Sequence, residues 1–248
     1  MTLPNRNSNA ITGSVFCQNN MSAPRDIRED NIVNEIISGN FPNFLREFEP
    51  ITINEKSNSI VLLVMKDYLC LGSNEDYVRM PLDPLKAQKV CDAFDCSLPT
   101  RKLVNDIWKN SENKLTPTPF GPPYDSSMMS MQRLLWSNDK INTQLKSKNP
   151  FALTSGHKKD VVLTNRLSPN NPKKRVAIYG WIKPDGIPIQ GLQPEVHEES
   201  YSDYSHGIRL IYNEVLIYGN MARLQDIFAD ISYSYLVSDE GNLTFRKY

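Results

Sequence analysis

Residues 159–182, KDVVLTNRLSPNNPKKRVAIYGWI, contain two runs rich in β-branched and aromatic residues on either side of a polar loop. Runs of this composition, separated by Asn, Pro and Ser, are typical of β-strands joined by a loop. From Phe151 onward the segments GIPIQ and GIRLIYNEVLIYG continue the pattern, the latter as a hairpin about Asn213-Glu214. The second part of the chain is therefore predicted to form a mainly antiparallel C-terminal sheet.

Helical patterns precede this region. In DIREDNIVNEIISGN (26–40) the isoleucines and valine fall on one helical face, and Gly39 fits a helix stop. Asp83-Pro84 is typical of a helix start, with a capping side chain followed by proline at the first helical position. A further helix is predicted from about Ser97 to Pro99 onward, and a long one over 126–146.

Short β-rich segments lie between these helices, and SIVLLVMKDYLCLGS (59–73) reads as a hairpin about Lys66-Asp67. Helices with short strands first, and a meander of strands afterwards, indicate the α+β class. Residues 1–25 are rich in Asn, Ser and Pro and are predicted to be a disordered leader. Residues 26–248 are predicted to form a single α+β domain, with a subdivision at the Pro-rich segment 115–124 as the alternative.

Composition excludes several classes of protein. The 248 residues include 28 Lys+Arg and 28 Asp+Glu, so the formal net charge is zero. Nucleic-acid-binding proteins usually carry a basic excess, so no nucleic-acid partner is predicted. No run reaches the roughly 18 apolar residues of a membrane span, and MTLPNRNSNAITGSVFCQNN lacks a signal-peptide core. The default expectation is a cytoplasmic chain of unknown oligomeric state.

Cys96 is the candidate nucleophile. In FDCSLPTRKLVNDIWK (94–109) it stands just before the predicted helix, whose unpaired N–H groups and positive dipole end favour a thiolate. Arg101 and Lys102 add positive charge in the first turns. The alternative is a structural residue, because cysteine is among the most frequently buried residue types.

The candidate general bases are histidines, which occur at three positions, all in the strand-rich part: His157, His197 and His206. His206 precedes a predicted strand, and Asp203 is close enough in sequence to orient its ring. His157 is the second choice of base, with Asp160 three residues later. Each histidine can equally be a satisfied structural residue.

Three segments resemble the NlpC/P60 group of papain-like cysteine peptidases. Asp95-Cys96-Ser97 is similar to the Asp-Cys-Ser-Gly stretch that opens a helix in that group. KKDVVLTN (158–165) and RVAIYGW (175–181) are similar, in the same order, to two of its strands. The resemblance implies a hydrolase of peptide bonds in peptidoglycan, or an amidase acting on a related acyl group.

The chain departs from that group at two positions. Leu98 replaces the glycine after Cys-Ser, and Arg175 replaces the histidine before VAIY. Arginine is always charged and cannot act as a base, so His206 or His157 must do so. The leading hypothesis is a cysteine-dependent hydrolase of a peptide, amide or glycan-linked substrate, without a cofactor. Substrate contacts are assigned to Arg175, Trp181 and Tyr204.

Two alternatives remain open. His157, Asp160, His197 and His206 could supply nitrogen and oxygen ligands to a zinc ion of a metal-dependent hydrolase, although no HExxH spacing occurs. The second alternative is a non-catalytic protein that binds carbohydrate or peptide, because aromatic residues concentrate between Tyr179 and Tyr212. Nucleotide-dependent chemistry is disfavoured, since neither GxxxxGK[ST] nor GxGxxG is present.

Overall fold

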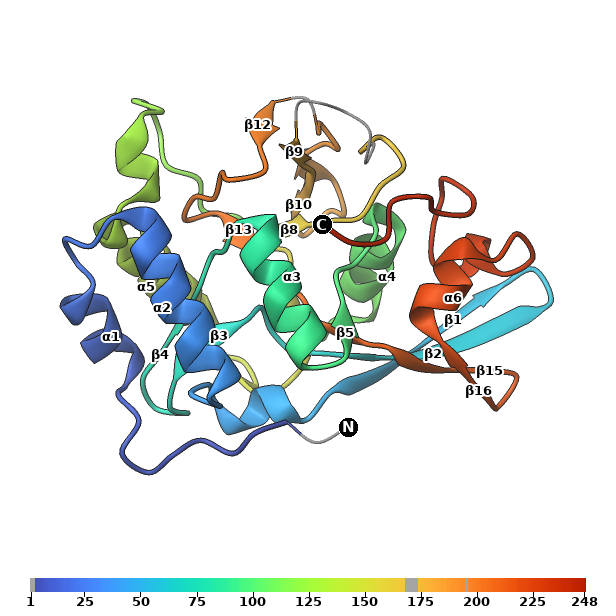
Figure 1. Cartoon of the computed structure of the whole chain (residues 1–248), viewed down its shortest axis with the longest axis horizontal. Helices are drawn as coiled ribbons and strands as arrows, with labels where there is room; N and C mark the ends of the chain where they lie inside the picture. The colour runs from blue at the N-terminus through green and yellow to red at the C-terminus, as the bar shows by residue number, and fades with distance from the viewer. Residues whose placement is uncertain (1–2, 168–173, 195) are drawn as a thin grey trace.

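The computed structural model describes residues 3–167, 174–194 and 196–248 (Figure 1). Helix accounts for 30% and strand for 23%, and the strands pair mostly antiparallel, which confirms the predicted α+β class. The helices of this part of the chain are α1 (Gly13–Asn19), α2 (Arg25–Ile37), α3 (Pro84–Ala93), α4 (Arg101–Asn110), α5 (Met131–Leu145) and α6 (Leu224–Ala229), with 3-10 helices η1 (Asn43–Arg46), η2 (Ser126–Met129) and η3 (Ser234–Leu236).

The largest sheet has the order β16-β15-β2-β14-β5, with β1 also paired to β2. Its strands are β1 (Glu49–Glu55), β2 (Asn58–Val64), β5 (Cys96–Ser97), β14 (Ile211–Tyr212), β15 (Glu214–Ile217) and β16 (Asn220–Arg223). Figure 1 shows the β1–β2 and β15–β16 hairpins projecting together from one end of the molecule. The chain thus joins its first strands to strands more than 150 residues later.

A second sheet has the order β11-β10-β8-β13 and holds the chemistry-bearing residues. Its strands are β8 (Lys159–Val161), β10 (Ile178–Ile182), β11 (Pro188–Gln190) and β13 (His206–Gly207). Strand β13 pairs parallel to β8, whereas the other pairs are antiparallel. Three two-stranded sheets complete the described strands: β3 (Cys70–Gly72) with β4 (Tyr77–Arg79), β6 (Asn113–Lys114) with β7 (Thr154–Ser155), and β9 (Arg175–Val176) with β12 (His197–Glu198).

Local signals place α2 and α3 where the sequence predicts them. Helix α2 buries Ile32 and Ile36 against α3, although Ile27 on the predicted apolar face is 49% exposed. Gly39 follows the helix with φ +95°, a conformation that glycine adopts without strain. The Asp83 side chain accepts a hydrogen bond of 2.9 Å from Lys86 N at the start of α3. Figure 1 shows the two helices side by side.

Three predictions, two of hairpins and one of a helix start, are wrong. Strand β2 pairs with β1 and not with β3, so no hairpin forms about Lys66-Asp67. Strand β14 pairs with β2 and β5, so β14 and β15 are not a hairpin about Asn213-Glu214. Helix α4 begins at Arg101, after a Thr100 cap, and not at Ser97 to Pro99. In each case pairing with a distant strand overrides the local pattern.

The prediction of a disordered leader is also wrong for the described residues of that segment. Residues 13–19 form α1, and Phe16 and Cys17 are buried in the main core. The Gly13 Cα faces the β3–β4 hairpin so closely that an added Cβ would lie 2.8 Å from Leu71 O. The Asn- and Ser-rich composition indicated disorder, but the few apolar residues of the segment are sufficient to anchor it.

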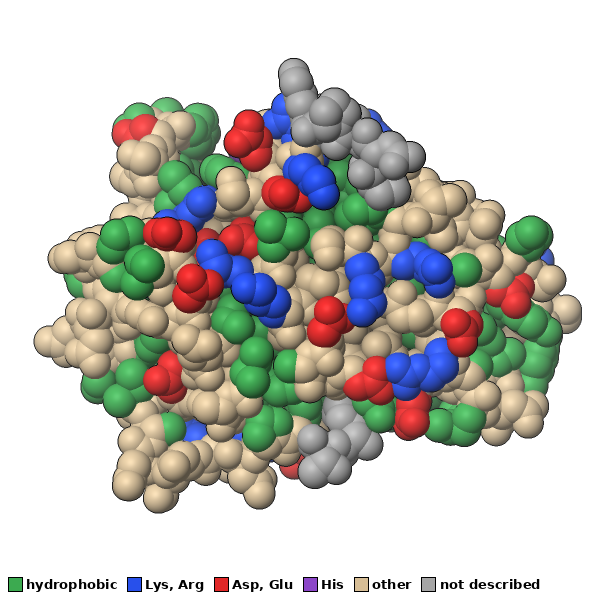
Figure 2. Space-filling view, in the orientation of Figure 1, with side chains coloured by type: hydrophobic (Ala, Val, Ile, Leu, Met, Phe, Trp, Pro, Cys, Tyr) green, Lys and Arg blue, Asp and Glu red, His purple; other side chains and the backbone are tan. Residues whose placement is uncertain are grey.

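One buried hydrophobic cluster joins elements from both sides of the Pro-rich segment 115–124. It includes Phe16 and Leu98 from the first part and Ile178 and Leu210 from the second. Within residues 3–167, 174–194 and 196–248, no helix is both long enough and apolar enough to cross a membrane. Figure 2 shows basic and acidic side chains interspersed over the visible described surface.

A buried ion pair fixes β4 to the loop before β3. Arg79 Nη2 and Nε lie 2.6 Å and 3.0 Å from Asp67 Oδ2, and both residues are almost fully buried. Arg79 Nη1 also donates to Asn138 Oδ1 of α5 at 3.1 Å. The Arg79 guanidinium holds the Asp67 pKa far below its usual value, although burial alone would raise it. The pair therefore stays charged in the interior.

Candidate functional site

A pocket of about 710 Å³ lies beside β8 and β13, and we call it the aromatic pocket. Its volume is within the range of small-molecule sites. Aromatic and apolar side chains make up most of its wall, and a few charged groups are set among them. The residues on which its chemistry depends are Phe120, Lys159, Trp181, His197, Tyr201, Asp203, Tyr204 and Ser205.

Strand β8 supplies the cation of the aromatic pocket. Its register pairs Lys159 with His206 of β13, and side chains alternate along the strand, so Lys158 and Asp160 point away from Lys159. Lys158 and Asp160 are almost fully buried, whereas Lys159 is partly exposed. Lys159 Nζ lies 4.2 Å from the centre of the Trp181 ring, a cation–π contact.

The Lys159 ammonium has no hydrogen bond or ion pair with another described residue. Burial lowers the pKa of Lys159, and the negative charge of Asp203 opposes that shift. The Asp203 carboxylate therefore supplies a nearby negative charge, but no hydrogen bond with a described residue occupies the Lys159 donors. The ammonium is therefore available to a ligand.

Strand β10 holds Trp181 through an unusual backbone. Gly180 has φ +127° and Trp181 has φ +50°, a region that a bulky residue rarely adopts. Two contacts fix this conformation: Trp181 N donates to Lys158 O at 2.9 Å, and Trp181 Nε1 donates to His157 O at 3.1 Å. The indole is thereby fixed between Lys159 and the Tyr204 ring, whose centroid lies 6.2 Å away.

Tyr204 links the sheet to the Pro-rich segment. Its hydroxyl accepts a hydrogen bond of 2.8 Å from Phe120 N, and the two rings meet edge to face at 4.9 Å. Lys158 Nζ donates to Tyr204 O at 2.5 Å from beneath. Burial lowers the pKa of Lys158 to about 7. The wall formed by Phe120 and Tyr204 is thus held by hydrogen bonds as well as by ring contacts.

Asp203 is the buried carboxylate of the pocket. The Tyr201 hydroxyl donates to Asp203 Oδ2 at 2.8 Å, and Ser205 donates to Oδ1 through both N (2.7 Å) and Oγ (2.5 Å). Burial would raise the Asp203 pKa, but nearby His206 and Lys159 and the Ser205 hydrogen bonds outweigh it and hold the pKa at about 2. Asp203 is therefore ionised and holds Tyr201 in place.

His206 lies behind the pocket and does not line it. Its side chain is 1% exposed, and neither ring nitrogen has a hydrogen-bond partner among the described residues. Burial lowers its pKa to about 4, against the effect of Asp203. Its ring meets the Tyr201 ring edge to face with centroids 5.5 Å apart, and the His197 ring stacks on Tyr201 at 3.9 Å. His206 is a neutral, enclosed imidazole.

His157 belongs to a different group of contacts. Its Nε2 lies 3.2 Å from Asp67 Oδ1, and its ring meets Tyr68 edge to face. Burial lowers its pKa to about 4. Asp160, predicted as its partner, instead accepts a hydrogen bond of 2.7 Å from the Tyr68 hydroxyl, and burial raises the Asp160 pKa to about 7.

Cys96 does not occupy the predicted position at a helix start. It lies in β5, paired with Tyr212 of β14, and is 2% exposed. Its Sγ lies 3.4 Å from Phe94 O. Burial raises the pKa of the thiol, and Asp95 adds to this effect. The expectation of a stabilised thiolate is therefore wrong, because the sheet encloses the sulfur that a helix dipole would have activated.

The predicted metal cluster does not form. No group of three His, Cys, Asp or Glu residues in the described part of the chain is placed to hold a metal ion. His157 contacts Asp67, His206 is enclosed, and His197 lies at the pocket edge beside Tyr201. The three histidines thus have three separate environments.

The structure brings together Trp181, Tyr204, Asp203 and His197 of the residues singled out in the sequence. Arg175, expected to contact substrate, pairs with Glu198 across β9 and β12 and lines neither of the cavities described here. Sequence reasoning missed Lys159, although a lysine beside a β-rich run is a visible signal. It also missed Phe120 and Arg25, which no local pattern marks.

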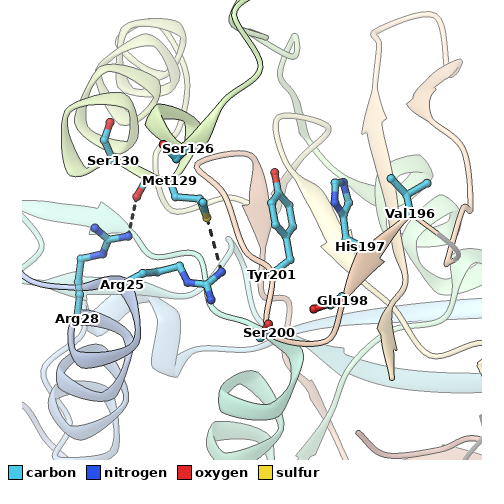
Figure 3. A pocket seen from close by; sticks show the side chains of 10 residues that line it. All are labelled: Arg25, Arg28, Ser126, Met129, Ser130, Val196, His197, Glu198, Ser200 and Tyr201. Carbon is cyan, nitrogen blue, oxygen red and sulfur yellow. Dashed lines mark hydrogen bonds between the residues drawn. The ribbon is translucent and has the colours of Figure 1, made fainter. Parts of the chain in front are cut away.

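A second cavity, of about 620 Å³, adjoins the aromatic pocket, and we call it the arginine cavity (Figure 3). The two cavities share Ser126, Met129, His197 and Tyr201. Figure 3 shows Arg25 and Arg28 reaching in from α2, with Tyr201, His197 and Glu198 on the opposite side. Searches with family models, among curated proteins and among solved structures find no match to this chain.

Proposed function

We propose that the chain binds a glycan in the aromatic pocket. The observation that carries this proposal is the combination of aromatic rings with separate hydrogen-bonding groups in one cavity. Phe120 and Tyr201 are partly exposed and offer ring surface, Lys159 offers donors, and the buried Tyr204, Asp203 and Ser205 hold these groups in place from behind. Sugar rings present apolar C–H faces and hydroxyl edges, and sites with this mixture of ring surface and placed polar groups suit them.

Binding is favoured over glycoside hydrolysis. Most glycosidases need one protonated carboxylic acid beside a second carboxylate. Asp125 and Asp203 line the pocket, but hydrogen bonds from Ser127 lower the Asp125 pKa, and the Asp203 pKa is about 2. Both are ionised at neutral pH, and neither can donate a proton. Asp160 has the raised pKa of an acid catalyst, yet it is buried away from the pocket.

The cysteine-dependent hydrolase stays a prediction from the sequence. A thiolate nucleophile needs exposure and a nearby base. Cys96 is buried, and no histidine is among the groups that shift its pKa. These observations support a binding protein in preference to a cysteine hydrolase.

Tryptophan fluorescence tests the proposal. Titration with N,N′-diacetylchitobiose is expected to change the emission of Trp181 with saturation, whereas a neutral tetrapeptide of alanine leaves it unchanged. Trp181→Phe should abolish the signal and weaken binding measured by calorimetry by about 2- to 10-fold, which corresponds to about 0.5–1.5 kcal/mol for an aromatic contact.

The matched control is Trp108→Phe, because Trp108 lies outside the aromatic pocket and contacts Lys114 instead. It should bind the disaccharide as the unmodified chain does. Absence of calorimetric heat with the disaccharide, or equal affinity in the Trp181 and Trp108 variants, would contradict glycan binding in this pocket.

A further inference from the structure

The arginine cavity adjoins the aromatic pocket. Four residues line both: Ser126 and Met129 from η2 and its end, and His197 and Tyr201 from the segment around β12. The His197 and Tyr201 rings stack face to face, with centroids 3.9 Å apart and an interplanar angle of 6°, so the pair borders both cavities as one unit. A ligand seated in the aromatic pocket therefore lies next to the cavity that Arg25 lines.

Arg25 has hydrogen-bond donors that the protein leaves largely unused. Its Nη1 lies 3.6 Å from Met129 Sδ, a weak acceptor, and its Nε lies 3.8 Å from Glu29 Oε1 (Figure 3). Glu29 is already engaged, because Ser202 Oγ donates to Oε1 and Asp83 N donates to Oε2 at 2.8 Å. The side chain of Arg25 is 29% exposed, so its guanidinium can meet a ligand.

Arg28 has a different role. Its Nη2 donates to Met129 O at 2.7 Å, and the residue is 8% exposed. This bond fixes the end of η2, which forms the upper wall in Figure 3. Arg28 therefore shapes the cavity, and Arg25 remains as the cation that can bind.

The negative charge of Glu198 limits where an anion can bind in the arginine cavity. It lines the same cavity from β12, opposite α2, and its pairing partner on β9 is Arg175. A carboxylate would be repelled from the Glu198 side and attracted to the Arg25 side. The planar guanidinium also matches a carboxylate, which it can bind through two parallel hydrogen bonds.

We infer that Arg25 binds a carboxylate substituent of the same glycan whose sugar ring occupies the aromatic pocket. The ligand class is thus an acidic sugar, with its carboxylate directed past the stacked His197–Tyr201 pair toward Arg25. This inference rests on the proposed function, because it needs the sugar to occupy the neighbouring pocket.

A matched pair of ligands tests the inference by calorimetry at pH 7. The first is the disaccharide of N-acetylglucosamine and N-acetylmuramic acid, which carries one lactyl carboxylate. The second is the same disaccharide with the carboxylate converted to a carboxamide. The unmodified chain is expected to bind the acid roughly 10-fold or more tightly than the amide, the range for one charge-assisted interaction.

Two variants should move acid binding in opposite directions. Arg25→Gln is expected to remove the preference for the acid while the affinity for the amide changes by less than about 2-fold. Glu198→Gln removes the repulsion and should increase acid affinity several-fold, again without affecting the amide. Arg101→Gln, which removes an arginine paired with the remote Asp239, is the control for a general loss of positive charge.

The outcomes separate the two proposals. If the acid and the amide bind equally to the unmodified chain, or if Arg25→Gln keeps the preference, the carboxylate site is overturned and glycan binding stands. If neither disaccharide binds, both are overturned. Thermal melts of the variants confirm that each is folded, and the opposite sign expected for Glu198→Gln does not depend on any loss of stability.

Discussion

Lys159 and Trp181 form a cation–π contact with the ammonium 4.2 Å from the ring centre, inside a pocket whose buried carboxylate, Asp203, opposes the effect of burial on the lysine pKa. The contact makes Trp181 a reporter of the lysine charge. Burial lowers the Lys159 pKa, so its proton should leave below the 10.5 of an ordinary lysine.

This titration can be followed by fluorescence in a chain with Trp108→Phe and Trp136→Phe, which leaves Trp181 as the single tryptophan of the three. The emission is expected to change with a midpoint below pH 10.5. Lys159→Met should remove the transition. If the chain that keeps Lys159 shows a midpoint at the pH of an ordinary lysine, burial does not act on this lysine.

The buried histidine His206 should make folding stability depend on pH. Its pKa is about 4 in the folded chain and about 6.5 when unfolded, so between these values the unfolded state binds more protons and stability rises with pH. From pH 4.5 to 6.5 this one group contributes about 2–3 kcal/mol, at about 1.4 kcal/mol per pKa unit.

Urea unfolding of His206→Asn measures this contribution as the difference in pH dependence from the unmodified chain. The contribution of Asp160 to the pH dependence of stability has the opposite sign, because its raised pKa of about 7 makes the folded state bind more protons than the unfolded state. Asp160→Asn should therefore steepen the rise with pH. Equal slopes for His206→Asn and the unmodified chain would mean that the imidazole is not enclosed as described.

Cys96 should react slowly with iodoacetamide in the folded protein. It is 2% exposed, and burial raises its pKa, so both access and thiolate fraction are low. Labelling at pH 8, read by mass spectrometry, is expected to be at least about 100-fold slower than for the same cysteine in urea, since reaction requires local opening. Rapid labelling with an apparent pKa below about 8.5 would restore the cysteine hydrolase hypothesis.

Breaking the buried pair of Asp67 and Arg79 should be costly. Asp67→Asn leaves the Arg79 guanidinium in the interior without its counter-charge, and the expected loss in the free energy of unfolding is about 3–5 kcal/mol. The control is Asp239→Asn, whose partner Arg101 is on the surface, with an expected change of about 0–1 kcal/mol. A similar small loss for both variants in urea unfolding would contradict the assigned burial.

The parts of the fold that could be predicted depend on neighbouring residues. Asp83 and Pro84 start α3 because a cap and a proline act within one turn. Cys96 was misplaced because its strand exists through pairing with Tyr212, 116 residues later, and nothing in the local pattern specifies that partner. The short strand β5 ends before the Thr100 cap, whose own side chain accepts from Leu103 N.

In the candidate site, too, features that depend on neighbouring residues could be predicted and features that depend on distant contacts could not. The sequence indicates Trp181 and Tyr204 because aromatic residues concentrate in that stretch, and Asp203 because it lies close to His206 in the sequence. Arg25 reaches the site from a helix more than 170 residues earlier, and only the packing of α2 beside η2 and β12 brings it there. The role of the histidines could not be predicted, because enclosure of His206 behind Tyr201 is a property of tertiary structure.

The parallel pairing of β8 with β13 also bears on how the chain reaches its folded state. Its register joins Lys159 to His206, which follows 47 positions later in the sequence, and the arginine cavity adds residues from α2. Contacts between distant segments form slowly, because a long loop must close before they contribute. A nascent chain that has not yet released residues 197–206 from the ribosome therefore lacks both cavities, so recognition of a ligand begins only after synthesis has passed that segment.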